Sequence, residues 1–295
     1  MPLRVTIVGH VAQTPRLPFD RLRVNGRVLK LSDISGHAAC QSMELLWATA
    51  PVNLRIVMDI IDSHTHWGPS VTLMGVNITT GELLQQAKQS GVAKIVIFPF
   101  PSTAIADEGI NENLLLEAQR IKEFIPYYYI PEDLRPIPHE KGFYGGKWHW
   151  VRGIQDCSSN YEVLEDPGVH KFIEESEHID LPIIFEEDLG FTELFVKRTK
   201  SLKLIIPHIG MLGGSSLDFL EAFEKYPNVY FDTSLASSGV VKRFLETIGP
   251  ERILFGSDIP FGTMKTELEK ILSLKIRTEE KELLLSKNLK RLTGL

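Results

Sequence analysis

The sequence predicts an α/β fold, a (β/α)8 TIM barrel preceded by an amino-terminal extension. Short apolar runs recur from Met58 onward, amphipathic segments separate them, and eight such runs fit into residues 58–295. Parallel strands that are covered on both faces by helices give continuous apolar runs of this kind. Eight strands that alternate with helices in a segment of this length are typical of one barrel.

The strands are expected at residues 58–62, 93–98, 127–130, 151–155, 182–186, 204–208, 229–232 and 253–257. Helix signals lie between them: Thr80 can cap a helix that ends at Gly91, and Ser215 with Asp218 approximates a capping box. Residues 131–150 are rich in Pro, Gly and aromatic side chains and predict a long loop between strands three and four. At the carboxyl end of the strands, such a loop would cover an active site.

Residues 1–57 differ from the rest in charge. They hold seven Lys and Arg against three acidic residues, whereas residues 58–295 hold 25 basic and 35 acidic residues. The shift marks a boundary before Met58. Asn25-Gly26 between two short apolar runs predicts a hairpin. Residues 1–57 are therefore either a small β appendage or a segment upstream of a true start at Met58, and the position of Met58 directly before the first clear strand favours the second interpretation.

The composition excludes several classes of protein. A net charge of −6 gives no electrostatic reason to expect nucleic acid or an anionic membrane as partner. Two cysteines, Cys40 and Cys157, form neither a disulfide framework nor a cysteine zinc site, which makes the cytoplasm the default location. No apolar run approaches the roughly 18 residues that span a bilayer, and no signal peptide is expected. A small-molecule substrate is the expected partner.

The sharpest motif ends the first predicted strand. In Asp62-Ser63-His64-Thr65-His66, alternate side chains of an extended segment point the same way, so His64 and His66 can present both imidazoles to one ion. Neutral imidazole suits Zn, Fe, Ni or Cu better than Mg or Ca. Two solvated loop histidines are the plain alternative, but catalytic groups sit at this end of barrel strands.

Polar groups also end three later strands. His208 closes strand six, Asp258 closes strand eight, and Glu186, Glu187 and Asp188 close strand five. Each alone has a structural interpretation, because such a His is often hydrogen-bonded scaffolding and such an Asp often caps a helix. Together they place imidazoles and carboxylates on one rim, which indicates a metal-dependent active site.

From Met58 to Leu295 the sequence resembles the amidohydrolase-related family, which contains hydrolases and metal-dependent decarboxylases. The matching segments are 62–66, 181–184, 207–210, 231–234, 254–258 and the tail 286–292, and residues 1–57 are not covered. The resemblance implies a mononuclear or, less often, binuclear site. It implies His64 and His66 as ligands, Asp258 as ligand or proton shuttle, and His208 as an acid/base or substrate-polarising group. A homodimer is also common in such barrels.

The sequence departs from the family at strand five, where members usually carry a metal-binding His and this chain has Glu186. A carboxylate can replace imidazole as a zinc ligand and favours harder metals. We therefore expect Glu186, with Glu187 as the alternative, as third ligand of a divalent ion, Zn first and Mn or Fe next. The opposite interpretation is that the substitution has cost the chain its chemistry.

Other candidates are less specific. Arg152 and Gln155 lie on the predicted strand four and could bind substrate, although Arg152 could equally pair with a structural acid. Gln155 stands near where related enzymes place a lysine or another site group. Cys157 is expected to be small and buried rather than nucleophilic. The remaining histidines are expected at the surface or, for His149, at the mouth of the pocket without a required role.

Three functions follow from the strand-end constellation. The first is metal-assisted hydrolysis of an amide, ester or lactone bond of a small organic acid, with Asp258 moving the proton and His208 stabilising the oxyanion. The second is a decarboxylase of a small, aromatic carboxylic acid that uses the same residues. The third is a non-catalytic barrel that binds a metal or metabolite.

Overall fold

The computed structural model describes residues 5–8, 21–24, 27–30, 59–73, 75–153 and 157–295. The chain divides into two compact units, residues 1–56 and 57–295. The first contains a three-stranded antiparallel sheet of β1 (Val5–Val8), β2 (Arg21–Val24) and β3 (Arg27–Lys30). Val24 pairs with Arg27, so β2 and β3 flank the sequence Asn25-Gly26, which itself lies outside the described residues.

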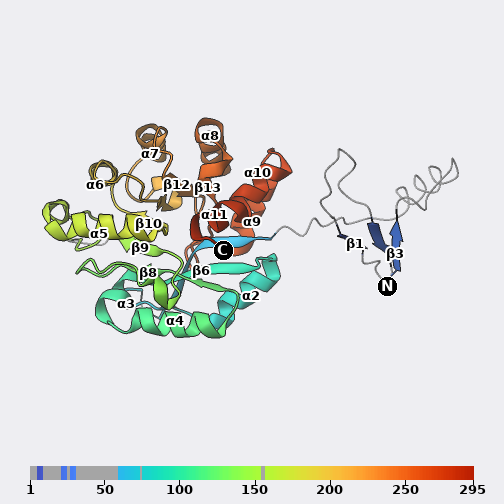
Figure 1. The fold of residues 1–295 in the computed structure, drawn as a ribbon, viewed down its shortest axis with the longest axis horizontal. Coiled ribbons are helices and arrows are strands. Elements are labelled where there is room, and N and C mark those ends of the chain that lie inside the picture. Colours follow the sequence, from blue (N-terminus) through green and yellow to red (C-terminus); the bar gives the residue numbers. More distant parts are fainter. Residues whose placement is uncertain (1–4, 9–20, 25–26, 31–58, 74, 154–156) are drawn as a thin grey trace. The chain divides into compact units, whose positions relative to one another are not determined.

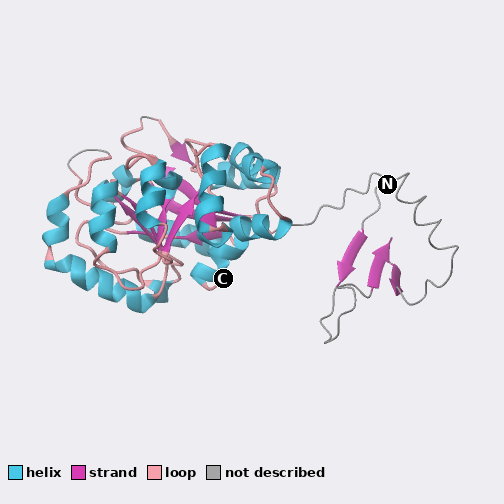
Figure 2. Cartoon of the chain, turned by 90° about the horizontal axis from the view of Figure 1, so that it is seen from above, coloured by secondary structure: helices cyan, strands magenta, loops and turns pink. Residues whose placement is uncertain are grey.

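The second unit is built on parallel strands with helices outside them (Figures 1 and 2). Its strands are β4 (Ile61–Pro69), β5 (Asn77–Ile78), β6 (Lys94–Pro99), β7 (Phe124–Pro126), β8 (Tyr128–Tyr129), β9 (Gly146–His149), β10 (Ile183–Glu186), β11 (Leu204–Ile206), β12 (Val229–Asp232) and β13 (Ile253–Leu254). They pair in the orders β5-β4-β6-β7 and β13-β12-β11-β10-β9-β8, with the short β5 antiparallel and every other pair parallel.

Backbone hydrogen bonds join the two sheets into one ring. On one side, β7 continues into β8 through Tyr127, whose N–H donates to the carbonyl of Ile97 at 2.9 Å. On the other side, β4 meets the segment after β13: the N–H of Asp258 donates to the carbonyl of His64 at 2.8 Å, and Thr65 forms a parallel bridge with Ile259. With β7 and β8 counted as one strand, eight parallel strands surround a common core, which confirms the predicted (β/α)8 barrel.

The helices that surround the strands are α2 (Thr80–Ser90), α3 (Pro101–Ala106), α4 (Ile110–Arg120), α5 (Pro167–Ile179), α6 (Leu189–Val196), α7 (Ser216–Phe223), α8 (Ser238–Ile248), α9 (Met264–Ser273), α10 (Thr278–Glu282) and α11 (Asn288–Thr293). Helix α2 ends at Gly91 in a left-handed conformation, as predicted, but its N-cap is Thr79 rather than Thr80. Ser215 is the N-cap of α7 without a side-chain cap hydrogen bond, so the predicted capping box is not formed.

Alternation along the strands separates two hydrophobic clusters. Ile95 and Ile97 of β6 belong to the large cluster between strands and helices, whereas Val96 and Phe98 belong to a smaller cluster that includes Ile184 of β10. This period of two is that of a strand buried on both faces. It fixes which side chains of the strand ends point into the barrel.

The prediction of strand four was wrong. Strand β9 occupies Gly146–His149, inside the segment expected to be a loop, and residues 151–153 form a turn. The two glycines that suggested a loop are required by packing. A Cβ atom at Gly145 would lie 2.4 Å from the Tyr127 ring, and one at Gly146 would lie 3.0 Å from Ile137.

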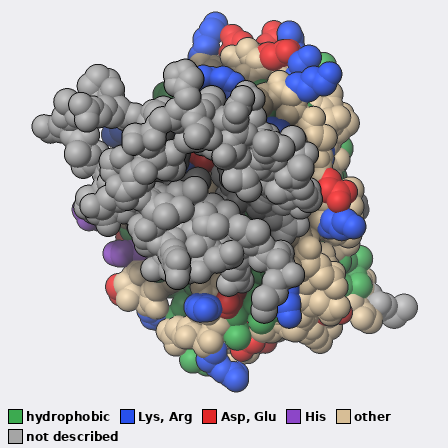
Figure 3. Space-filling model, turned by 90° about the vertical axis from the view of Figure 1, so that its right-hand side faces the viewer, with side chains coloured by type: hydrophobic (Ala, Val, Ile, Leu, Met, Phe, Trp, Pro, Cys, Tyr) green, Lys and Arg blue, Asp and Glu red, His purple; other side chains and the backbone are tan. Residues whose placement is uncertain are grey.

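In the part of the barrel surface drawn by residue type in Figure 3, basic and acidic side chains are interspersed. Among the described residues, no helix is both long enough and apolar enough to cross a bilayer.

Candidate metal and acid–base centre

Three of the predicted site residues converge at the junction of the first and last strands. His64 and His66 lie on β4, Asp258 follows β13, and all three side chains are buried. Oδ1 of Asp258 lies 3.3 Å from Nε2 of His64 and 3.4 Å from Nε2 of His66. The three residues can each offer one ligand atom within 4.8 Å of the others. The motif on strand one and the carboxylate on strand eight therefore form one cluster.

Three atoms of this cluster are buried without a hydrogen-bond partner, namely Nε2 of His64, Nδ1 of His66 and Oδ1 of Asp258, and the first and last of these face each other. Burial of polar atoms is costly unless they find a partner. A divalent ion between Nε2 of His64 and Oδ1 of Asp258 would satisfy both of these atoms, and a donor set of two imidazoles and one carboxylate suits Zn, Mn or Fe. The residues present therefore fit a metal ion.

Asp232 orients the imidazole of His64 through Nδ1, the ring nitrogen that does not face Asp258. Oδ2 of Asp232 lies 2.8 Å from Nδ1 of His64, and Asp232 is the end residue of β12. Burial works to raise the pKa of the Asp232 carboxyl, but His64 and further hydrogen bonds hold that pKa below its ordinary value. A carboxylate that accepts the Nδ1 proton fixes the tautomer with Nε2 free, as in metal sites where an outer carboxylate supports a ligating His. The sequence-based analysis assigned no role to Asp232, although it also ends a strand.

His208 lies beside the cluster in a strained backbone conformation. Its φ is 54° and that of Ile209 is 55°, a left-handed region that costs a non-glycine residue about 1–3 kcal/mol. The conformation aims the imidazole into the barrel, where Nδ1 lies 2.8 Å from Oγ of Ser234 and 3.8 Å from Oδ2 of Asp258. Because the Ser234 hydroxyl donates to Asp232, it can accept the Nδ1 proton of His208. Nε2 then faces the site.

Asp258 also has a left-handed backbone, with φ at 54°. Burial raises the pKa of its carboxyl. Its two oxygens face different groups, Oδ1 toward His64 and His66 and Oδ2 toward His208. The Asp258 carboxylate is therefore shared between the candidate metal position and the imidazole of His208.

Glu186 is brought to the same end of the barrel but has other partners. Lys147, the inward-facing residue of β9, donates from Nζ to Oε2 of Glu186. Nε2 of His149 lies 3.5 Å from the same oxygen, and Nε2 of His208 lies 3.8 Å from Oε1. No role was predicted for Lys147 from the sequence because the residue fell in the predicted loop. The alternation in Gly146-Lys147-Trp148-His149 is the signal that could have found it.

Arg152, one of the two substrate-binding candidates, has partners outside this arrangement. The guanidinium of Arg152 is held by Asp166, with Nη1 2.6 Å from Oδ2, and Nε donates to the carbonyl of Glu132. Gln155 lies outside the described residues. Cys157 is exposed, so the expectation of a buried side chain was wrong.

Glu187, the alternative ligand, is turned toward the loop after β9. Its Oε1 accepts hydrogen bonds from Nε1 of Trp148 at 2.8 Å and from N–H of Val151 at 3.0 Å. Burial raises the pKa of Glu187 to about 7. These contacts tie strand five to the neighbouring turn.

Aromatic rings form one wall of the site. Phe100 stacks on His66 with ring centroids 4.6 Å apart and planes 11° apart. Phe98 meets both imidazoles of the motif edge-on. Phe261 contacts His66 from the surface and is 56% exposed.

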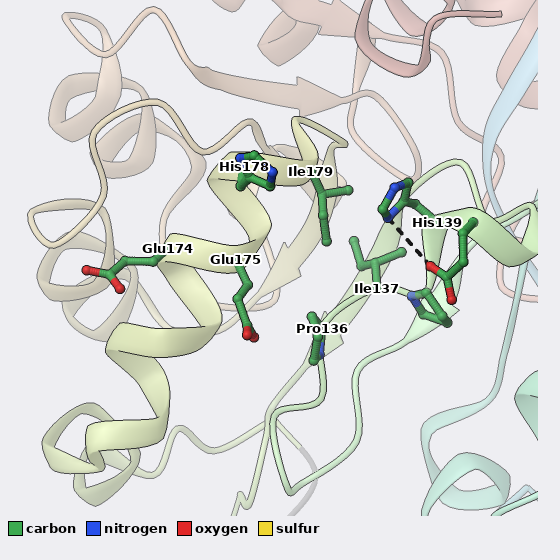
Figure 4. Close-up of a pocket in the computed structure, with 9 residues that line it drawn as sticks. Pro136, Ile137, His139, Glu174, Glu175, His178 and Ile179 are labelled. Atoms are coloured by element: carbon green, nitrogen blue, oxygen red, sulfur yellow. Dashed lines mark ion pairs between the residues drawn. The ribbon is translucent and has the colours of Figure 1, made fainter.

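A groove of about 500 Å³ lies elsewhere on the barrel, between α5 and residues 136–140 (Figure 4). His139 and His178 line it from opposite sides. None of the strand-end residues described above belongs to its lining.

The chain is thus a (β/α)8 barrel with a buried cluster of two imidazoles and a carboxylate at one rim, and this cluster could hold a metal ion. The sequence model of the family described as "Amidohydrolase" matches residues 144–295. This match covers half of the chain, which therefore belongs to the amidohydrolase family. No curated protein matches the chain.

Solved structures share its fold. An amidohydrolase from Burkholderia multivorans with bound zinc is 14% identical, with 80% of this chain and 99% of that chain covered and a TM-score of 0.64. A probable 2-pyrone-4,6-dicarboxylic acid hydrolase from Acinetobacter baumannii is 15% identical, with 81% and 100% covered and a TM-score of 0.64. A dihydroxybenzoic acid decarboxylase from Polaromonas with bound manganese is 14% identical, with 80% and 97% covered and the same TM-score.

Proposed function

We propose that this chain is a metal-dependent hydrolase that cleaves an amide, ester or lactone bond of a small organic acid. The observation that carries the proposal is the convergence of two buried, partnerless atoms, Nε2 of His64 and Oδ1 of Asp258, 3.3 Å apart. Nε2 of His66 lies 3.4 Å from the same oxygen.

His64, His66 and Asp258 would hold the ion. Zinc is the first candidate, with manganese and iron as alternatives, and the bound zinc and manganese in two of the similar structures support this choice. The ion would supply a Lewis acid that polarises a substrate carbonyl and increases the acidity of water.

Asp258 would move the proton. Its Oδ2 is directed toward His208, whereas Oδ1 faces His64 and His66, so Oδ2 is the oxygen that can accept a proton. It would take a proton from the attacking water and return it to the leaving group.

His208 would bind the developing oxyanion. The Ser234 hydroxyl is placed to accept the Nδ1 proton, and Nε2 faces the site 3.8 Å from Oε1 of Glu186. With a proton on each ring nitrogen, Nε2–H would donate to the substrate oxygen as its negative charge increases.

A decarboxylase of an aromatic acid is the second candidate. The ring stack of Phe100 on His66, with Phe98 and Phe261 beside it, suits a flat aromatic substrate. The Polaromonas structure carries the name of a dihydroxybenzoic acid decarboxylase. In this reaction Asp258 or His208 would protonate the ring carbon from which carbon dioxide leaves.

The test combines metal analysis with two assays. We expect about one metal ion per chain in the wild type and in the control variant His170→Ala/His178→Ala, whose exposed histidines lie on α5. The variant His64→Ala/His66→Ala should lose the ion. Proton release from esters and lactones, or amine release from amides, would establish the hydrolase, whereas carbon dioxide release from hydroxylated benzoates would establish the decarboxylase. Bound metal without turnover in either panel would favour a non-catalytic barrel.

A further inference from the structure

Glu186 ends strand β10, the position from which a further metal ligand was expected. It lies on β10, beside β9, and the strand register pairs Ile184 with Lys147 and Glu186 with His149. Ile184 belongs to the inner cluster of the barrel, so Glu186, two residues further along the same strand, also points inward. Trp148, the alternate residue of β9, belongs to the outer cluster, so Lys147 points inward as well.

Both oxygens of Glu186 have cationic or imidazole neighbours. Oε2 accepts from Nζ of Lys147 and lies 3.5 Å from Nε2 of His149, while Oε1 lies 3.8 Å from Nε2 of His208. The partnerless atoms among the proposed ligands are on His64, His66 and Asp258, and no atom of Glu186 is among them. Among the described residues, two groups could hold an ion, His64 with either His66 and Asp258 or His208 and Asp232, and neither includes Glu186.

Lys147 depends on this carboxylate. The Lys147 side chain is 1% exposed, and its Nζ pairs with Glu186. Nζ also lies 5.0 Å from the centre of the Phe98 ring. An ion that recruited Glu186 would leave an uncompensated ammonium in the barrel core. That ammonium would lie close to a second positive charge in a medium of low dielectric constant. The ion pair therefore opposes ligation by Glu186.

We propose that Lys147 withholds Glu186 from the metal site, so that the ion is bound by His64, His66 and Asp258 and the strand-five side stays open to substrate. This inference rests on the proposed metal site. Three protein ligands with a free position are the arrangement of catalytic rather than structural zinc sites. It replaces the expectation that Glu186 is the third ligand.

The decisive variant is Lys147→Met/Glu186→Gln, because it removes a neutral pair and conserves the net charge of the site. Affinity for Zn²⁺ and Mn²⁺ is measured by competition with a chromophoric chelator. If Glu186 is not a ligand, the double variant should keep the wild-type affinity within about threefold. The absorption spectrum of bound Co²⁺ should also be unchanged, since the ligand set is the same.

The single variant Lys147→Met tests the role of the lysine. It frees Glu186 to reach the ion, so affinity should increase about tenfold or more, with a larger gain for Mn²⁺ because a carboxylate oxygen is added. The Co²⁺ spectrum should change as well. Thermal unfolding checks that the variants fold. If the single variant does not fold, the double variant, which buries no unpaired charge, still carries the test.

Each outcome is decisive. A loss of about tenfold or more in the double variant would show that Glu186 is a ligand and overturn the inference. Unchanged affinity in the single variant would overturn the role of Lys147. If the wild type binds no ion but Lys147→Met does, and the double variant does not, the inference stands and the metal-dependent function falls. Absence of binding in all three proteins would overturn both.

Discussion

Nδ1 of His64 lies 2.8 Å from Oδ2 of Asp232, so the imidazole of strand one is oriented by the carboxylate of strand seven. Both side chains are fully buried. The same carboxylate accepts hydrogen bonds through Oδ1 from the backbone N–H groups of His208 and Ser234. Asp232 thus supports two imidazoles that the proposed reaction uses in different ways.

Asp232→Asn should weaken metal binding by about 10- to 100-fold, because the amide no longer fixes the His64 tautomer with Nε2 free. Chelator competition measures the effect. Asp218→Asn, at an exposed position of α7, is the control and should keep wild-type affinity. Equal affinity of Asp232→Asn and wild type would contradict the orienting role.

Gly210→Ala should destabilise the fold by several kcal/mol. The residue has a φ of 78°, and an added Cβ would lie 2.3 Å from the Phe219 ring, so the helix behind strand six must shift. Gly75→Ala is the matched control, since its φ is 77° but nothing lies within 4 Å of the added atom. Its cost should be about 1 kcal/mol. Denaturant unfolding would measure both, and equal losses would contradict the packing argument.

Glu177 should stabilise the barrel in a pH-dependent way. Its Oε1 accepts backbone N–H groups of Lys200, Ser201 and Leu202, and although burial works to raise the pKa of the carboxyl, these donors hold it below the ordinary value. A lowered folded-state pKa contributes stability above the unfolded value of about 4.5, and this contribution is lost as pH falls through the folded pKa.

Glu177→Gln should therefore lower the free energy of unfolding by about 1 kcal/mol at pH 7, and the difference from wild type should shrink toward pH 3. Urea unfolding at both pH values gives the comparison. The exposed Glu174 on the same helix provides the control Glu174→Gln, which should show little effect. A difference that grows on acidification would reverse the sign and refute the argument.

Phe261→Ala should weaken the binding of a hydroxylated benzoate by about five- to tenfold, the usual value of one aromatic pair. The ring contacts His66 and is 56% exposed, so the free energy of unfolding should hardly change. Titration calorimetry measures the affinity. Leu272→Ala, another exposed apolar residue, should bind as the wild type does. An unchanged affinity for Phe261→Ala would place the aromatic substrate elsewhere.

The barrel and the His64–His66–Asp258 cluster could be predicted because their signals are local. Alternation places His64 and His66 on one side of a strand, and carboxyl ends of parallel strands meet at one rim. The ion pair of Lys147 with Glu186 could not be predicted in this way. It depends on where strand four begins, and two glycines whose Cβ positions are filled by Tyr127 and Ile137 made that strand resemble a loop. The role of Arg152 likewise depends on Asp166, a partner that no spacing rule indicates.

The site forms only when the first and last strands of the barrel have paired. The N–H of Ser257 donates to Oδ1 of Asp62 across 195 residues of sequence, and the N–H of Asp258 donates to the carbonyl of His64. During synthesis, His64 and His66 emerge long before Asp258, so the proposed set of three ligands is complete only when the last strand has been made. An ion held by all three residues would add its binding free energy to the closure of the ring, and the stability of the closed barrel would then increase with the concentration of that ion.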